Sequence, residues 1–280
     1  MKSIRTKGWM GILLILGLMG CDNDVVPYQS DPDRYFAISG YLDTTQNVQV
    51  LRVEPYRFYD GTPRFTAIRA FTSDLQGQQI MWRDTLFALD NGGQGHGFTA
   101  RFIPKAGETY TFAVEDAQGH RTTALITMPQ SPSLTFAAPY KDGRGYYMQP
   151  YLGQRILEPY DARVRYTVSK SPHDEAKEVM VDYTRNGRFL NGEWAGELSL
   201  NLDMSKIKKA LELSPEIQFF SVQMDLVQLD DQWRTMLYTP NKSFSNVSNG
   251  TGFVVAKTFT SHTWRLSTDV VTYLGMTDRQ

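Results

Sequence analysis

The sequence is poor in the features that mark several protein classes. Its 280 residues contain one cysteine, which cannot close an intramolecular disulfide or supply a cysteine-type zinc site. The 29 lysine and arginine residues nearly balance the 30 aspartate and glutamate residues, so a net charge of −1 gives no basic field for nucleic acid. Hydrophobic residues make up 41% of the chain, which argues against wholesale disorder. We therefore expect a folded protein with no nucleic-acid partner.

The sequence also lacks the common motifs of nucleophilic and metal-dependent catalysis. No serine lies in a G-x-S-x-G motif. The histidines have no partner at the i, i+4 or H-x-H spacing of a metal site: His96, His120, His173 and His262. Carboxylate pairs of the glycosidase type are assembled only in space, so a sequence does not reveal them. We expect no metal, no cofactor and a protein that is not an enzyme.

Two short motifs suggest a chemistry that their context does not support. Residues 91–97 are rich in glycine, but a phosphate-binding loop needs Gly-Lys-Ser/Thr at the start of a helix, and residues 98–102 read as a strand. We expect a hairpin loop there, with His96 exposed. The segment Ser171 to Glu175 places His173 beside two carboxylates, yet adjacent loop residues do not converge on one ion without further ligands.

The N-terminus has the pattern of a signal peptide. Three cations precede an apolar run from Trp9 to Gly20, which is shorter than the roughly 20 residues of a membrane span. Leu18-Met19-Gly20-Cys21 resembles the lipobox of bacterial lipoproteins. The resemblance implies that residues 1–20 are removed and that Cys21 carries the lipid. Residues 21–33 then form a polar tether, and the lipid on Cys21 binds the protein to a membrane.

Most of the remaining chain reads as β-strands. Tyr110, Phe112 and Val114 alternate with smaller or polar residues, and so do Val164, Tyr166 and Val168. Asn-Gly, Asp-Gly and Gln-Gly pairs separate such runs at the short spacing of a sandwich or barrel. Only one stretch looks helical, from an N-cap at Asp203 to Leu211. The pattern predicts an all-β protein with one short helix.

Two prolines mark a boundary between two β units. Pro129 and Pro132 follow a complete strand and cannot lie in the middle of a sheet. We expect an N-terminal sandwich of the immunoglobulin or transthyretin type at residues 34–128. A linker at residues 129–133 and a C-terminal β domain at residues 134–280 complete the predicted organisation.

Several segments together resemble one lipoprotein family of Bacteroidota, known as domain of unknown function 4249. Besides the lipobox, they are Ile38-Ser39-Gly40-Tyr41, Lys105 to Val114, Asp116 to Gly119, Thr122 to Pro129 and Phe244 to Phe253. The resemblance covers almost the whole chain, although Thr251 stands where the family usually has an apolar residue. It implies an outer-membrane location, on the periplasmic face or the cell surface. Such genes often lie beside outer-membrane receptor genes, so the resemblance also implies a receptor partner.

Tyrosines gather in the segment from Pro139 to Tyr160. Tyrosine-rich loops are typical of binding surfaces, because the ring gives a large amphipathic contact area at low entropic cost. The candidate surface consists of Tyr140, Tyr146, Tyr147, Tyr151 and Tyr160. The alternative is that these rings pack against the second β unit.

We therefore expect a non-enzymatic, lipid-anchored cell-envelope protein that acts as a binding or accessory component of an outer-membrane assembly. One alternative is a β-scaffold hydrolase acting on polysaccharide, with Asp142, Glu158 or Asp174 beside the tyrosines. Another is a fimbrial or adhesin subunit, although the tether at residues 21–33 is too polar to be an obvious donor strand.

Overall fold

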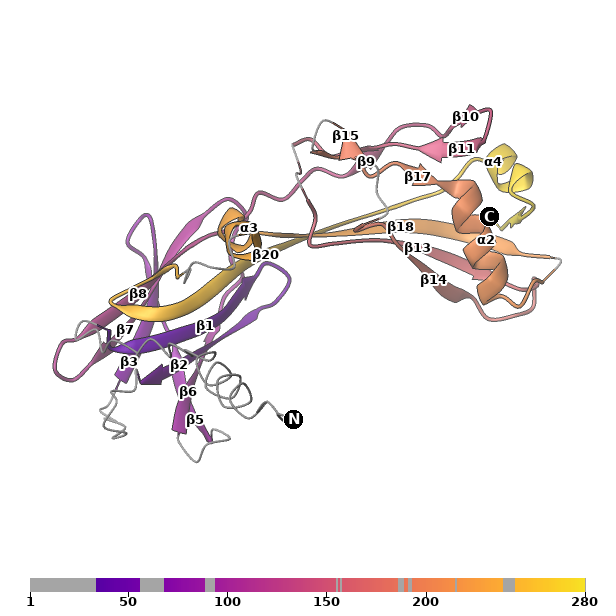
Figure 1. Ribbon diagram of the computed structural model, residues 1–280. Coiled ribbons are helices and arrows are strands. Elements are labelled where there is room, and N and C mark those ends of the chain that lie inside the picture. The colour runs from indigo at the N-terminus through magenta and orange to yellow at the C-terminus, as the bar shows by residue number, and fades with distance from the viewer. Residues whose placement is uncertain are drawn as a thin grey trace, which may run out of the picture.

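A computed structural model shows two β-rich units that share one long sheet (Figure 1). It describes residues 34–55, 68–88, 94–154, 156, 158–185, 189–190, 193–214, 216–238 and 245–279. Cys21, the predicted signal peptide and the predicted tether lie outside the described residues. Among the helices that the structure describes, none is long and apolar enough to cross a membrane.

The shared sheet has nine strands in the order β14-β13-β18-β20-β1-β2-β6-β5, with β21 paired to β18. The strands are β1 Phe36–Asp43, β2 Val48–Pro55, β5 Arg83–Ala88, β6 Gln94–Arg101, β13 Asp161–Ser169, β14 Lys177–Asp182, β18 Gln218–Leu229, β20 Gly250–Trp264 and β21 Thr277–Asp278. The N-terminal half of β20 pairs in parallel with β1, and its C-terminal half pairs antiparallel with β18. Strand β20 therefore runs from one unit into the other (Figure 1).

The N-terminal unit is a sandwich. Its second sheet has the order β19-β8-β7-β3-β4, with β3 Ile68–Asp74, β4 Gln79–Met81, β7 Thr109–Asp116, β8 Arg121–Thr127 and β19 Val247–Ser248. Alternate residues of both sheets, such as Ile38, Leu51 and Phe112, are fully buried in one core. The same core contains residues from the far end of the chain: Val247, Val254 and Ala256.

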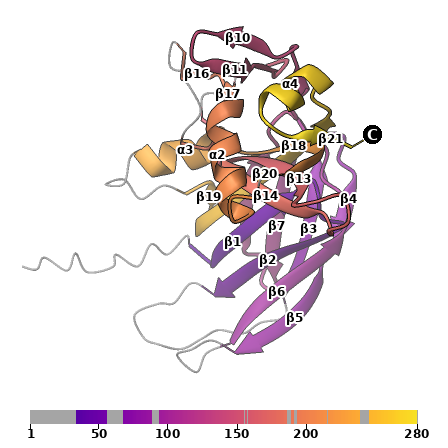
Figure 2. The same cartoon turned by 90° about the vertical axis from the view of Figure 1, so that its right-hand side faces the viewer.

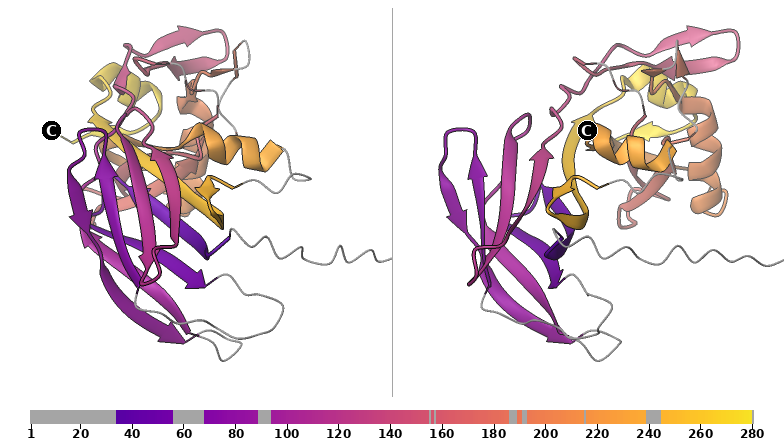
Figure 3. Two further views of the ribbon diagram at one scale, coloured as in Figure 1. Left: turned by 90° about the vertical axis from the view of Figure 1, so that its left-hand side faces the viewer. Right: turned by 60° about the vertical axis from the view of Figure 1, so that its left-hand side comes forward.

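In the second unit, helices and small sheets pack on one face of strands β14, β13 and β18 (Figures 2 and 3). The helices are α2 Leu200–Ala210 and α4 Thr268–Tyr273, and α3 Asp231–Tyr238 follows β18. The small strands are β9 Thr135–Phe136, β10 Tyr140–Asp142, β11 Gly145–Met148, β12 Pro150–Tyr151, β15 Phe189–Leu190, β16 Glu193–Trp194 and β17 Leu198–Ser199. A second core lies under them, with Tyr166, Trp194 and Phe219 almost fully buried.

Close backbone contact joins β1 to the start of β20. Gly252 has a φ of +108°, and a side chain there would collide with the Ile38 carbonyl on the neighbouring strand. Just before β20, Asn246 Oδ1 accepts from the Val254 amide at 2.9 Å, and Asn246 Nδ2 donates to the Val254 carbonyl at 2.7 Å. Gly252 thus allows the close approach of β1, while Asn246 holds the segment before β20 against the strand itself.

The expected all-β, sandwich-like fold is confirmed. The single predicted helix exists, but its predicted start is wrong, because α2 begins at Leu200 with Ser199 as the N-cap. Asp203 lies inside the first turn, where its carboxylate binds tyrosine hydroxyls rather than the helix amides. Helices α3 and α4 were not predicted. The proposed domain boundaries stay a prediction, since β20 contributes to both units.

Candidate binding surface

Two of the predicted tyrosines form a pair on the β10–β11 hairpin. Tyr140 and Tyr147 lie directly opposite each other in the antiparallel register. Their rings are stacked with centroids 5.9 Å apart, and the Tyr140 ring is 43% exposed. The Tyr140 hydroxyl donates to Glu197 Oε2 at 2.6 Å, a charge-assisted hydrogen bond that fixes the direction of the ring. The pair therefore presents aromatic area to solvent in a defined orientation.

The opposite face of the hairpin packs on the protein. Tyr146 lies opposite Lys141 in the hairpin and meets the Tyr273 ring of α4 edge to face, with centroids 4.7 Å apart. The Lys141 ammonium lies 4.6 Å from the Tyr273 centroid and 5.9 Å from the Tyr146 centroid, within the range of a cation–π contact. Tyr146 also packs against the core of the second unit. This tyrosine mainly holds the hairpin in place.

Two elements support the hairpin from below. Strand β11 pairs with β17, where Tyr147 lies opposite Ser199. The Tyr146 amide donates to Asn201 Oδ1 at 2.8 Å. Gly145 has a φ of +148°, and a side chain there would collide with Asn201. The hairpin thus rests on the start of α2.

A buried carboxylate anchors that start of α2. Asp203 accepts a hydrogen bond from the Tyr166 hydroxyl at 2.6 Å and another from the Tyr183 hydroxyl at 2.7 Å. The Tyr183 oxygen in turn accepts from the Ser199 amide at 3.1 Å. Burial raises the pKa of Asp203 to about 6, although both hydroxyls and Lys206 act in the opposite direction. The network links the sheet, the helix and β17, so it positions the hairpin indirectly.

The other two predicted tyrosines do not join this pair. Tyr151 lies on β12, which pairs with β9, and is 62% exposed. Tyr160 precedes β13, and its ring lies 6.4 Å from that of Trp233 on α3. Trp233 also contacts the Phe253 ring, with centroids 6.3 Å apart. The five tyrosines are therefore divided between the β10–β11 hairpin, β12 and a separate aromatic group beside α3.

Sequence reasoning missed the partners that complete both aromatic groups. Tyr273 and Trp233 lie on the two short helices that the sequence pattern did not reveal. Glu197 and Asn201 are far from the hairpin in sequence and reach it only through β17 and α2. Gly145 was the one sequence signal for this contact, because a glycine inside a strand often marks a place where another part of the chain approaches closely.

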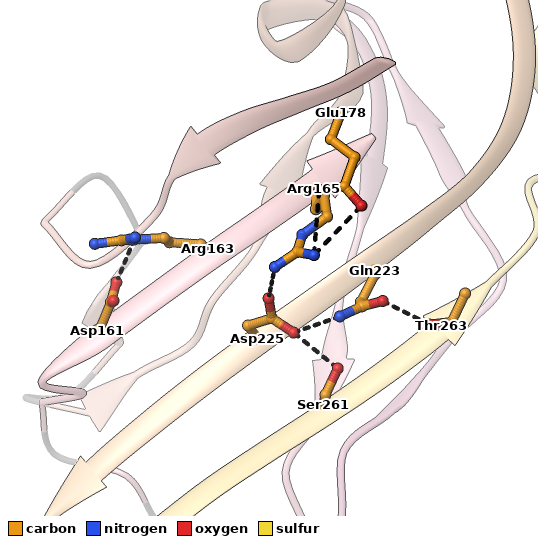
Figure 4. A network of polar contacts seen from close by, with 8 residues as sticks. All are labelled: Asp161, Arg163, Arg165, Glu178, Gln223, Asp225, Ser261 and Thr263. Carbon is orange, nitrogen blue, oxygen red and sulfur yellow. Dashed lines mark hydrogen bonds and ion pairs between the residues drawn. The ribbon is translucent and has the colours of Figure 1, made fainter. Parts of the chain in front are cut away.

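A polar network covers the outer face of the sheet in the second unit (Figure 4). Arg165 lies between Glu178 and Asp225, with its Nη2 atom 2.9 Å from Asp225 Oδ2. Asp225 Oδ1 accepts from Gln223 Nε2 and from Ser261 Oγ, each at 2.7 Å. Both oxygens of Asp225 are therefore engaged by neighbouring strands, which suits a cross-strand link rather than a general base.

One prediction about a candidate residue is wrong. His96 was expected to be exposed in a loop, but it lies on β6, is only 6% exposed and stacks on Phe98. Its Nδ1 atom lies 2.8 Å from Asp84 Oδ2 on the neighbouring strand β5. Strand β6 begins at Gln94, before Gly95 and Gly97 of the glycine-rich run. His96 therefore lies in the strand and points toward the core side of the sheet.

The carboxylates of the hydrolase alternative lie at a strand end and in loops. Asp142 Oδ1 accepts from the Arg144 amide at 2.7 Å, closing the β10–β11 turn. Asp174 and Glu158 are exposed. In the described part of the chain there is no group of three or more His, Cys, Asp or Glu side chains that could hold a metal ion.

Comparisons with known proteins identify no relative by sequence. No family model matches the chain, and no curated protein matches it. Among solved structures, the crystal structure of pullulanase from Anoxybacillus sp. LM18-11 aligns with a TM-score of 0.24 at 11% identity. The same enzyme complexed with maltotriose aligns with a TM-score of 0.25. The alignments cover 68% and 69% of this chain but only 24% of the pullulanase chain. A likeness at this level carries no argument about function.

Proposed function

We propose that this protein is a lipid-anchored, non-enzymatic binding component of an outer-membrane assembly, within the lipoprotein family that its sequence resembles. Its contact surface is the Tyr140–Tyr147 pair on the β10–β11 hairpin, and its partner is an outer-membrane receptor. The observation that carries the proposal is the two-sided construction of the hairpin. One face is fixed on Tyr273 and Asn201, while the other holds an oriented aromatic pair toward solvent.

The position of the hairpin supports this role. Strand β1 begins at Phe36, opposite Gly250, which is the end of β20 farthest from the second unit. The hairpin lies at the opposite end of the molecule, beside α4 (Figure 1). A lipid at Cys21 would thus join the described fold at one end and leave the tyrosine pair at the other. Rigid aromatic rings with a hydroxyl are enriched in the energetically important parts of interfaces.

The test compares two variants of the hairpin. In Tyr140→Ala/Tyr147→Ala we expect a nearly unchanged melting temperature, because Tyr140 is partly exposed and the pair lies on the outer face of the hairpin. The same variant should lose most of the receptor that copurifies from solubilised outer membranes. Tyr146→Ala, the matched control, should lower the free energy of unfolding by about 1 to 3 kcal/mol, because its ring packs on Tyr273 and the core.

Two outcomes would reject the proposal. One is undiminished copurification of the receptor with the double variant. The other is a loss of stability in the double variant as large as that of Tyr146→Ala, which would show that the pair serves packing.

A further inference from the structure

A pocket with mixed polar and apolar walls lies where the two units meet. It has a volume of about 450 Å³, within the range of small-molecule sites, which often lie between domains. Its walls come from four separate segments: the loop before β7, the end of β8 with the following linker, the chain after β12, and the end of β18 with the start of α3. The residues are Gly107, Thr127, Met128, Pro129, Gln130, Gln154, Gln228, Leu229, Asp230, Asp231 and Gln232.

Hydrogen bonds hold these segments together. The Gly107 amide lies 3.2 Å from both the Met128 and the Pro129 carbonyl oxygens, which fixes the linker against the loop before β7. Gln154 Nε2 donates to the Gln130 carbonyl at 3.0 Å and to Gln228 Oε1 at 3.1 Å. A site built on such fixed elements needs little reorganisation when a ligand binds.

Asp230 has a structural role beside the pocket. Its Oδ2 atom accepts from the Ala256 amide at 2.6 Å, and its Oδ1 atom accepts from the Trp233 amide at 2.9 Å. The side chain thus caps α3 and ties it to β20. It places Asp231 and Gln232 at the pocket but has both oxygens already engaged.

The lining has the chemistry of a site for neutral hydroxyl groups. Four glutamines contribute amides: Gln130, Gln154, Gln228 and Gln232. Each amide carries both donors and acceptors, so it can match a hydroxyl group, which also donates and accepts. Among the described lining residues there is no lysine, arginine or histidine, and Asp231 is exposed, so an anionic ligand would meet repulsion. The partly exposed Pro129 and Leu229 add an apolar wall that suits the C–H face of a sugar ring.

Gln232 offers a specific reason for a ligand. Its Oε1 atom is buried and has no hydrogen-bond partner among the residues that the structure describes. Buried polar atoms without a partner are uncommon, because they have given up hydration without compensation. The χ3 torsion of glutamine has a broad distribution, so the Gln232 amide can rotate toward a ligand in the pocket. Because Oε1 makes no hydrogen bond to a described residue, that rotation would break none at this atom.

We infer that this pocket binds a neutral saccharide of one or two rings, through the side-chain amides of Gln228 and Gln232 and the carboxylate of Asp231. This goes beyond the proposed receptor contact, because the pocket and the β10–β11 hairpin share no residue.

The test is calorimetric titration of the purified protein with a panel of neutral disaccharides, with uronic-acid disaccharides and tri-alanine as comparisons. We expect a neutral disaccharide to bind, and Gln228→Ala and Gln232→Ala each to raise its Kd about tenfold. Gln118→Ala, in the exposed turn after β7, should leave the Kd unchanged. Asp231→Asn should also weaken binding, and because this residue is exposed its substitution leaves the core intact. Tyr140→Ala/Tyr147→Ala should bind the saccharide normally, whatever it does to receptor binding.

Three results would overturn the inference. The first is that no neutral disaccharide binds. The second is preferred binding of the acidic disaccharides or of tri-alanine. The third is a Kd that the substitutions at positions 228, 231 and 232 leave unchanged.

Discussion

Asp203 shows how one buried side chain can make the fold sensitive to pH. Its pKa is about 6 in the folded protein, against an ordinary value of 3.8, because burial disfavours the charged form. Between these values the folded state binds more protons than the unfolded state. The free energy of unfolding contributed by this group is therefore largest below about pH 4 and falls as the pH rises to about 6.

Replacing Asp203 by asparagine should remove this dependence. The amide keeps the size of the side chain and can still bond to the Tyr166 and Tyr183 hydroxyls. As the pH rises from 4 to 7, the free energy of unfolding of Asp203→Asn should increase by about 3 kcal/mol relative to that of the unsubstituted protein. This difference corresponds to the pKa shift of Asp203. Urea unfolding of both proteins across this range measures the difference. A difference that stays constant with pH would contradict the assignment, and Asp174→Asn, at an exposed position, is the control.

Individual side chains were the hardest part to predict from the sequence. Asp203 had the right residue type for an N-cap, and nothing local revealed that two tyrosines from other strands would bind it. His96 was expected to be exposed because it follows glycines, but Asp84 on the neighbouring strand fixes it against Phe98. In both cases a partner distant in sequence outweighed the local pattern.

The strands were easier to predict than the helices. Period-two alternation identified β7 and β13 correctly, because one face of each is buried. Helices α3 and α4 have only 8 and 6 residues, which is too short for a clear 3.6-residue period. The parallel pairing of β1 with β20 joins residues more than 200 positions apart, and no local pattern encodes it.

The β1–β20 pairing leads to a prediction about Gly252. A side chain there would face a positive φ and a collision with the Ile38 carbonyl. We expect Gly252→Ala to lower the free energy of unfolding by about 3 kcal/mol or more, combining backbone strain with overpacking. Gly77→Ala is the matched control, since Gly77 also has a positive φ but no described residue lies within 4 Å of the added atom. Chemical denaturation measures both, and an equal loss in the two variants would show that the contact with β1 has no part in the effect.

The whole molecule combines two cores with one continuous sheet, so neither end of the described chain is independent of the other. Residues 247 to 256 complete the N-terminal sandwich, while the rest of β20 belongs to the second unit. The sequence indicated two β units, but it did not show that the last long strand would connect them. The tyrosine segment was identified as a candidate surface, yet only the fold separates Tyr160 from the hairpin pair.

The proposed anchor concerns the molecule as a whole. Cys21 is the only thiol in the chain and follows the lipobox-like residues. We expect Cys21→Ala to leave an unprocessed precursor or to release the protein from membranes, because acyl chains would supply the attachment. Cell fractionation with detection of the product size measures this. A mature-sized Cys21→Ala protein that still partitions fully with membranes would rule out the lipid anchor.

The most direct test of the binding role is site-specific photo-crosslinking in intact cells. A photoreactive phenylalanine analogue is placed at Tyr140 on the hairpin or at Tyr41 on β1, an exposed tyrosine of the other unit. We predict a discrete crosslink from position 140 to one outer-membrane receptor and none to that receptor from position 41. Equal crosslinking from both positions, or none from position 140, would contradict it.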